Sequence, residues 1–331
     1  MNSFYDGGFK GGLPNLLFEI HQDQPQIAKA EIEALTGKEA TCWGSYIVVD
    51  ARFHPRLVRL AFTRRIFKIV ASCDASNLLS TIDSLPKSII SGSFAIRVYP
   101  QHLRDLERPI AKILFHKQSN PKVDLTNPDT LFAVFIHNKK VIVARHVLTV
   151  VNDFEKRKAH KRPGLRPVSL HPKLAAAMVN LTGIRSGRIL DPCVGTGGIL
   201  LEASLMGLMS VGIDLDQEMV RRCRATLDHY GEHAADLRCQ DALLHKGRFP
   251  YVVSDLPYAR NTPKMDVRAF YKALIGRLEH WKTKQAVLGM PHTIDPLDLI
   301  KGSGFKVRRR FTIYVHKSLS KQIVVLERKN V

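Results

Sequence analysis

The stretch Ile189-Leu-Asp191-Pro-Cys-Val-Gly195-Thr-Gly197-Gly198-Ile199 decides the fold. An apolar strand ends in an acid, turns through glycines and enters a helix. Glycine lets the backbone approach a ligand at the carboxyl edge of a sheet, where open α/β folds bind. The stretch is not the dinucleotide fingerprint G-x-G-x-x-G, because Leu200 stands at its third glycine position, and no Gly-Lys-Ser/Thr follows as in a phosphate-binding loop.

Outward from this stretch, helical and strand patterns alternate along the second half of the chain. They predict helices at Pro172–Thr182, Ile199–Met206, Gln217–Tyr230 and Val267–His280, and strands at Arg188–Leu190, Ser210–Ile213, Leu237–Cys239, Tyr251–Ser254 and Gln285–Gly289. Such alternation implies right-handed crossovers and an open, mostly parallel sheet with helices on both faces. Residues Lys306–Val315 and Gln322–Glu327 then predict a closing antiparallel hairpin.

The first half is also α/β in character. Its patterns predict helices at Gln24–Thr36, Leu57–Phe67, Ser76–Leu85 and Pro109–Lys117, strands at Tyr46–Asp50 and Ser93–Tyr99, and a hairpin of Thr130–Ile136 with Lys140–Ala144. The segment from Asp153 to Leu170 is charged and contains two prolines. We interpret it as a domain linker or an exposed basic arm.

Composition and charge narrow the partner. The 331 residues suit about two domains, and 50 Lys+Arg against 30 Asp+Glu give a net charge of +20. Residues 1–50 sum to −4, residues 51–170 to +14 and residues 171–331 to +10. This excess indicates a polyanionic partner, with nucleic acid the leading candidate. No apolar run approaches the roughly 18 residues of a membrane helix, and no signal pattern opens the chain, so we expect a cytoplasmic protein without a membrane partner.

Acids after consecutive strands predict a cofactor site. Asp191 would repel a pyrophosphate but suits a ligand with an ammonium and a sulfonium, such as S-adenosylmethionine. Asp214 lies 19 residues after Gly195, where a ribose diol is accepted, with Asp216 as the alternative. Asp241 follows the next strand and could accept an adenine amino group. Five scattered cysteines without C-x-x-C spacing, and histidines without ligand spacing, predict no metal site.

The stretch Asp255-Leu256-Pro257-Tyr258 predicts the chemistry. The lone pair of an exocyclic amine is delocalised into its base, so methylating it requires acceptors that localise and orient that lone pair. The Asp255 carboxylate and the Leu256 carbonyl could accept the two N–H protons. Pro257 stiffens the turn, and Tyr258 offers a ring on which a flipped base stacks.

Together these motifs resemble an amino-directed, Rossmann-type S-adenosylmethionine methyltransferase. More narrowly, Arg162-Pro-Gly-Leu-Arg-Pro-Val-Ser-Leu-His-Pro-Lys-Leu-Ala-Ala-Ala-Met-Val-Asn-Leu-Thr182 and the ending Val315-His-Lys-Ser-Leu-Ser320 resemble archaeal tRNA guanosine N2-methyltransferases. This resemblance implies a ferredoxin-like subdomain at 1–55, a tRNA-binding THUMP domain at 56–150, a basic linker at 151–168 and the methyltransferase domain at 169–331. It also implies that guanosine 10 of tRNA is the substrate, to the mono- or dimethyl form. Some relatives need a small zinc-binding activator protein, which this sequence neither requires nor excludes.

Carried over by motif, the resemblance assigns the site residues. The catalytic set is Asp255, Leu256, Pro257 and Tyr258, and the cofactor-binding set is Asp191, Pro192, Gly195, Thr196, Gly197, Asp214, Leu215, Asp241, Ala242 and Asp255. Leu256 replaces the first proline of the commoner D-P-P-Y form, and Ala259 stands where many members have glycine. An adenine N6-methyltransferase acting on RNA or DNA, a noncatalytic RNA-binding protein and a dinucleotide oxidoreductase are the competing hypotheses.

Overall fold

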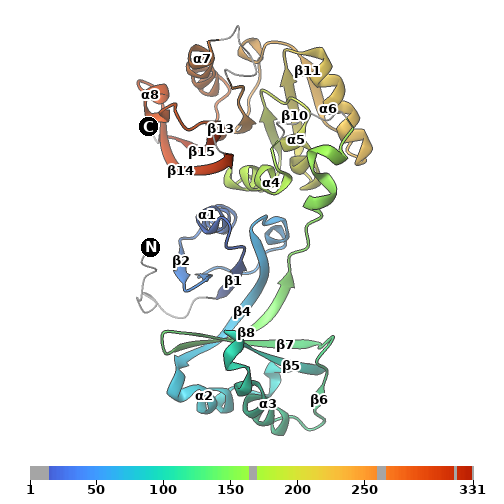
Figure 1. The fold of residues 1–331 in the computed structure, drawn as a ribbon, viewed down its shortest axis with the longest axis vertical. Helices are drawn as coiled ribbons and strands as arrows, with labels where there is room; N and C mark the ends of the chain where they lie inside the picture. The colour runs from blue at the N-terminus through green and yellow to red at the C-terminus, as the bar shows by residue number, and fades with distance from the viewer. Residues whose placement is uncertain (1–14, 164–169, 259–265, 317–318, 330–331) are drawn as a thin grey trace. The chain divides into compact units, whose positions relative to one another are not determined.

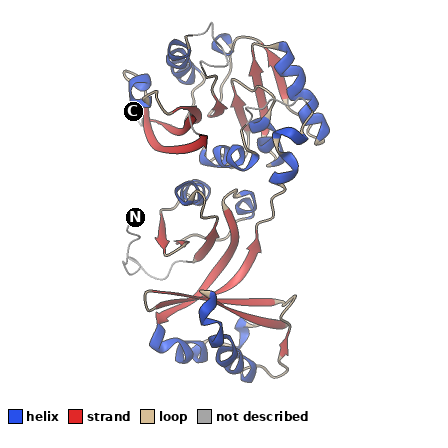
Figure 2. Ribbon diagram, in the orientation of Figure 1, coloured by secondary structure: helices blue, strands red, loops and turns tan. Residues whose placement is uncertain are grey.

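The computed structural model describes residues 15–163, 170–258, 266–316 and 319–329. These residues form two compact units, each built around one sheet (Figure 2). The first unit holds the described residues of 1–25, 36–58 and 63–151. The second unit holds 26–35, 59–62 and the described residues from 152 onward. Two short pieces from the N-terminal part of the chain therefore belong to the second unit.

The second unit contains a seven-stranded sheet in the order β11-β10-β9-β12-β13-β15-β14. Its strands are β9 (Arg188–Asp191), β10 (Met209–Asp214), β11 (Asp236–Cys239), β12 (Tyr251–Asp255), β13 (Gln285–Pro291), β14 (Phe305–His316) and β15 (Leu319–Arg328). The first five pair in parallel, and β15 runs antiparallel between β13 and β14. The predicted parallel sheet with a closing hairpin is confirmed.

Helices cover both faces of this sheet. They are α4 (Pro172–Leu181), α5 (Gly198–Leu205), α6 (Gln217–His229), α7 (Val267–His280) and α8 (Pro296–Ile300). Helices α7 and α8 lie on one side, and α5 and α6 lie on the other (Figure 1). Asp216, Asp266 and Asp295 cap α6, α7 and α8 by accepting backbone N–H groups of the first turn, which explains why these helices begin where they do.

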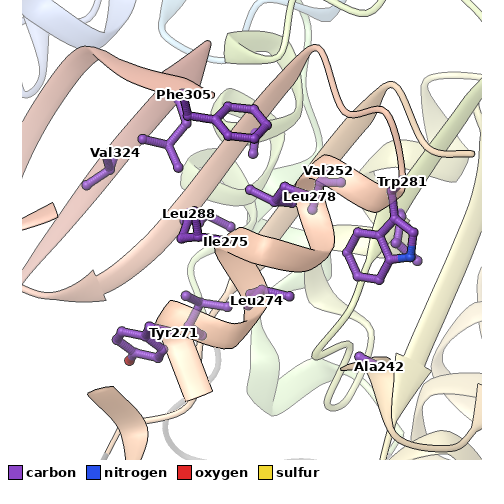
Figure 3. Close-up of a cluster of buried hydrophobic side chains, with 14 of the residues drawn as sticks. Ala242, Val252, Tyr271, Leu274, Ile275, Leu278, Trp281, Leu288, Phe305 and Val324 are labelled. Atoms are coloured by element: carbon purple, nitrogen blue, oxygen red, sulfur yellow. The ribbon is translucent and has the colours of Figure 1, made fainter. Parts of the chain in front are cut away.

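The largest core of this unit lies between α7 and the strands. Tyr271, Leu274, Ile275 and Leu278 recur at helical spacing and point from α7 toward Val252, Leu288 and Val324 (Figure 3). Burying each large apolar side chain stabilises the fold by about 1.5–3 kcal/mol. Trp281, the C-cap residue of α7, is fully buried, and its Nε1 donates to the His245 carbonyl at 2.9 Å. This packing fixes β12 and β13 rigidly, so side chains at their ends have defined positions.

Helix α1 (Pro25–Thr36), of which residues 26–35 belong to the second unit, is held in that unit by Glu31, which is fully buried. Its Oε1 accepts from Ala61 N at 3.0 Å and from Asn180 Nδ2 at 2.8 Å, and its Oε2 accepts from Phe62 N at 3.1 Å. The predicted helix over Leu57–Phe67 is wrong for this reason. Backbone N–H groups that would continue a helix donate to Glu31 instead, so only a short 3-10 turn, Pro55–Arg59, forms before strand β4 (Thr63–Asp74).

The first unit contains an eight-stranded sheet in the order β2-β3-β1-β4-β8-β7-β5-β6. Besides β4, its strands are β1 (Leu16–Ile20), β2 (Ala40–Trp43), β3 (Tyr46–Val49), β5 (Ser93–Tyr99), β6 (Lys122–Val123), β7 (Thr130–His137) and β8 (Lys140–Thr149). Helices α2 (Leu78–Ser84) and α3 (Glu107–His116) share an apolar core with β5, β7 and β8. The predicted hairpin of β7 and β8 is confirmed, and its turn residues Asn138 and Lys139 have positive φ.

The predicted linker is partly bound to the second unit. Residues 164–169 lie outside the described residues, as do 317–318 of the C-terminal resemblance. Within the described part, Arg157 donates through Nε and Nη2 to the buried carboxylate of Glu202 at 2.8 and 2.9 Å. The α/β fold class with two sheets is confirmed. The identification of the first half as ferredoxin-like and THUMP domains stays a prediction.

Candidate functional site

The predicted site residues follow the carboxyl ends of four neighbouring strands, β11, β10, β9 and β12. Because these strands are parallel, their ends meet at one edge of the sheet. The chain leaves β9 toward β10 on one side and returns to β12 on the other, so the strand order reverses between β9 and β12. Open α/β sheets bind ligands at this switch point. The topology therefore brings together the residues that the sequence singled out.

The turn after β9 depends on its glycines. Gly195 and Gly197 have φ of +51° and +82°, which L side chains rarely adopt. A Cβ on Gly197 would also lie 2.5 Å from the Cys223 sulfur of α6. A Cβ on Gly195 would meet nothing within 4 Å, so the space beside it is open. The turn thus packs tightly against α6 at Gly197 and leaves open space for a ligand at Gly195.

Asp191 ends β9 and is 2% exposed. Its Oδ1 accepts from Ser254 Oγ at 2.6 Å and from Cys193 N at 3.1 Å. The pKa of Asp191 is raised from its usual 3.8 to about 7, chiefly by burial; the nearby charges of Asp214 and Asp255 also raise it, whereas these two hydrogen bonds lower it. An anion that is costly when unpaired would be stabilised by a cationic ligand.

Asp214 ends β10 and ties that strand to the glycine turn. Its Oδ2 accepts from Gly195 N at 2.8 Å and its Oδ1 from Asp216 N at 3.0 Å, while burial raises its pKa above the usual range. A carboxylate has about four acceptor positions, so room remains for ribose hydroxyls. Asp216 caps α6 through Glu218 N at 2.8 Å, which favours Asp214 over Asp216 for the ribose. Leu215 is 61% exposed beside them and offers an apolar surface.

Asp241 follows β11 as predicted, and the structure gives it a local task. Its Oδ1 accepts from Leu243 N at 2.8 Å and caps the short 3-10 turn Ala242–Leu244. Ala242 is buried in the main core. This cap fixes the position of the carboxyl group at the sheet edge, and its remaining acceptor positions suit an amino group.

The Asp255 carboxylate lies at the end of β12 and is bound by a residue that the sequence did not indicate. Lys321 of β15 donates to Oδ1 at 2.8 Å and to Oδ2 at 2.6 Å, and its side chain is only 8% exposed. The same ammonium lies 5.3 Å from the centre of the Tyr258 ring. The sequence does contain a signal for Lys321. It shares one strand face with Ile323 and Val325, and a lone cation among apolar residues is unusual there.

The Leu256-Pro257 segment is fixed by two hydrogen bonds. Leu256 N donates to the Gly289 carbonyl at 2.9 Å, and the Tyr271 hydroxyl donates to the Pro257 carbonyl at 2.6 Å. Burial and the negative charge of Asp255 raise the pKa of Tyr258, so its phenol stays protonated. The predicted catalytic stretch is therefore held rigidly beside the glycine turn.

The residues present fit S-adenosylmethionine. Its ammonium and sulfonium need nearby carboxylates, and its ribose needs an acceptor for two hydroxyl groups. Its methionine part needs the open space at Gly195. Among the described residues, no group of three His, Cys, Asp or Glu could hold a metal ion. No helix in the described ranges is long and apolar enough to cross a bilayer.

Comparisons with known proteins find methyltransferases that are similar to this chain. The family model described as the RMKL-like methyltransferase domain matches residues 159–321. The tRNA (guanine(10)-N2)-dimethyltransferase of Methanothermobacter thermautotrophicus is 32% identical over 340 residues, which cover 93% of this chain and 98% of that protein. The protein of the same name from Pyrococcus abyssi is 34% identical over 325 residues, covering 92% and 96%. The crystal structure of TrmN from Thermus thermophilus aligns with 95% of this chain and 99% of its own at 19% identity and a TM-score of 0.49.

Proposed function

This chain belongs to the family of tRNA (guanine(10)-N2)-dimethyltransferases, and we propose that it methylates the N2 amine of a guanosine in tRNA, using S-adenosylmethionine. The observation that carries this proposal is the position of Asp255, Leu256, Pro257 and Tyr258 beside the glycine turn of β9. An amine acceptor and a cofactor cradle at one switch point are what transfer to an exocyclic amine requires.

The chain's own residues prepare the amine. When bound, S-adenosylmethionine supplies an electrophilic methyl group on a cationic sulfur. The Asp255 carboxylate accepts a hydrogen bond from one N2–H, and the carbonyl of the next residue, Leu256, accepts one from the other. These two acceptors turn the nitrogen lone pair away from the base and fix its direction. The Tyr258 ring supplies a face on which the extruded guanine stacks.

The same residues hold the cofactor in place. Asp191 pairs with its ammonium, Asp214 accepts the ribose hydroxyls and Asp241 accepts the adenine amino group. The turn around its methionine part is formed by Pro192, Gly195, Thr196 and Gly197. The adenine is lined by Leu215 and Ala242. The hydrogen bonds from Gly195 to Asp214 and from Ser254 to Asp191 support this assignment, because they fix both carboxylates relative to the turn.

The first unit is proposed to bind the tRNA, as a ferredoxin-like and THUMP module. Of the +14 charge of residues 51–170, +9 lies in the first unit and supports this, since phosphate contacts by Lys and Arg supply most of the affinity for RNA. The affinity of the full chain for tRNA should fall linearly with salt on a double-logarithmic plot. A salt-independent affinity would contradict this part of the proposal.

The product of the reaction tests the function directly. The full chain alone is incubated with unmodified tRNA and labelled S-adenosylmethionine, and the nucleosides are identified by mass spectrometry. We expect N2-methylguanosine followed by N2,N2-dimethylguanosine, mapped to position 10. N6-methyladenosine would establish the competing function instead, and no product on any tRNA would refute the proposal that this chain by itself methylates guanosine. Transfer without an added protein would also show that no activator is required.

Replacing the amine acceptor tests the mechanism. Asp255→Ala should lower kcat at least about 10³-fold, because one of two acceptors for the amine is lost. The affinity for tRNA should change little, since Asp255 is a single residue of the proposed tRNA-binding surface. Asp298→Ala is a matched control, because its exposed carboxylate lies in a surface ion pair with Arg268 at 2.9 Å. Wild-type transfer by Asp255→Ala would rule out this role.

A further inference from the structure

The ion pair between Asp255 and Lys321 is buried inside the site, where such pairs are costly to form. The Lys321 side chain is 8% exposed and that of Asp255 is 20% exposed. A buried ion pair contributes little net stability, because desolvation of both charges offsets their attraction. Packing alone therefore gives no reason for a lysine at this position of an otherwise apolar strand face.

The sheet register explains how the two groups meet. Asp255 lies beside Gly289 of β13, and Gly289 lies beside Ile323 of β15. Lys321 is two residues from Ile323 and shares its face. The Asp255 side chain can reach across β13 only because Gly289 has no side chain: a Cβ there would lie 2.5 Å from Asp255 Oδ1. Gly289 has an ordinary negative-φ strand conformation, so this close approach is what requires the glycine.

We propose that Lys321 is a positioning residue for methyl transfer, and that Gly289 provides the space for it. The ammonium donates to both carboxylate oxygens and so fixes the rotation of the carboxylate. Of the roughly four acceptor positions of a carboxylate, those that remain then point in one direction, toward the amine. The inference rests on the proposed function, since it needs an amine that Asp255 accepts.

Lys321 also balances the acids of the site. The negative charges of Asp214 and Asp255 each raise the pKa of Asp191, because each repels its ionised carboxylate. A cation on Asp255 reduces this repulsion and leaves Asp191 and Asp214 for the cofactor. Lys321 thus separates the carboxylate for the amine from the carboxylates for the cofactor.

Replacing the lysine tests the role. Lys321→Ala should lower kcat about 10²-fold, the loss expected when a reacting group is misplaced by about 1 Å. The Kd for S-adenosylmethionine and the KM for tRNA should stay within about threefold of wild type. Ethylammonium added to the assay should restore part of kcat by occupying the space of the lost ammonium, whereas tetramethylammonium, which has no N–H, should not. The control is Lys306→Ala on the same hairpin, whose exposed ammonium pairs with Glu327 at 3.3 Å.

A second pair of variants keeps the test independent of the buried lysine. Gly289→Ala should displace the carboxylate and lower kcat without weakening cofactor binding. Gly276→Ala in α7 is its control, because a Cβ there meets nothing within 4 Å. Wild-type kcat in either Lys321→Ala or Gly289→Ala would overturn the inference, as would a loss of kcat that ethylammonium leaves unchanged. If the wild-type chain methylated a different amine, the proposed substrate would fail, but these variants would still test the positioning role.

Discussion

The affinity for S-adenosylmethionine should depend on the protonation of Asp191. Burial raises the pKa of this carboxyl to about 7 in the cofactor-free chain, so below that pH most molecules carry a neutral acid. The proposed partner of Asp191 is the cofactor's ammonium, which needs the ionised form. Binding must then release a proton, and affinity must fall as pH falls.

The magnitude follows from the ionised fraction. The apparent Kd is the intrinsic Kd divided by the fraction of competent protein. With a pKa of about 7, that fraction is about 0.09 at about pH 6 and about 0.6 at about pH 7.2, so affinity should rise about sevenfold between them. The range stops there because the cofactor's α-amino group loses its own proton near pH 7.7–8.0. Near pH 6, binding should release about 0.9 protons per site.

Isothermal titration calorimetry measures both quantities when it is repeated in buffers of different ionisation enthalpy. Asp191→Asn keeps an acceptor for Cys193 N and Ser254 Oγ but removes the charge. It should weaken binding near pH 7.2 by about tenfold, the worth of a charge-assisted hydrogen bond, and should lose the part of the pH dependence that Asp191 causes. The pKa of Asp214 is raised as well, so only this variant isolates Asp191. An unchanged pH dependence in Asp191→Asn would refute the assignment of the ammonium to Asp191.

Two further predictions concern stability and the turn. Burial raises the pKa of Glu31 from 4.5 to about 7, so its contribution to the free energy of unfolding is complete below about pH 4.5 and is lost, by up to about 3 kcal/mol, as pH rises through 7. Denaturant unfolding at several pH values should show a shallower fall for Glu31→Gln, and an identical fall would contradict the argument. Gly197→Ala should weaken cofactor binding and lower Tm, since the new Cβ would lie 2.5 Å from Cys223 Sγ at a φ of +82°. Adding Cys223→Ala should restore the part of the Tm that the contact with Cys223 Sγ removes, but not the part that the positive φ of residue 197 removes. An unchanged Tm in Gly197→Ala would contradict the argument.

Local sequence was a good guide where local interactions decide the structure. The predicted helix Val267–His280 matches α7 to the residue, because Asp266 caps its start and its apolar residues recur at helical spacing. The strand Ser93–Tyr99 is likewise confirmed. The acids and glycines of the site were predictable because parallel strands place their carboxyl ends at one edge.

Pairing between distant strands could not be predicted in the same way. Lys321 reaches Asp255 only through the register of β13 against β12 and β15, which a sequence pattern does not specify. Ser254 was missed because its contact with Asp191 joins two strand ends that lie 63 residues apart. The wrong helix at Leu57–Phe67 has a similar cause, since a carboxylate 30 residues upstream takes the N–H of Ala61.

The contacts of Glu31 change how the roles of the two halves should be separated. An obvious experiment is to delete residues 1–150 and measure whether the remaining chain still binds the cofactor but no longer binds tRNA. Such a chain would lack α1 and residues 59–62, although both belong to the second unit. Asn180 Nδ2, in a fully buried side chain, would lose the Glu31 carboxylate at 2.8 Å and the Arg59 carbonyl at 2.8 Å, and a buried donor left unpaired costs about 1–3 kcal/mol. Lower activity of that chain would therefore not distinguish lost RNA contacts from a weakened catalytic unit. Substituting exposed cations of the first unit, such as Arg64 and Lys68 on β4, leaves the Glu31 contacts intact and tests the RNA contacts alone.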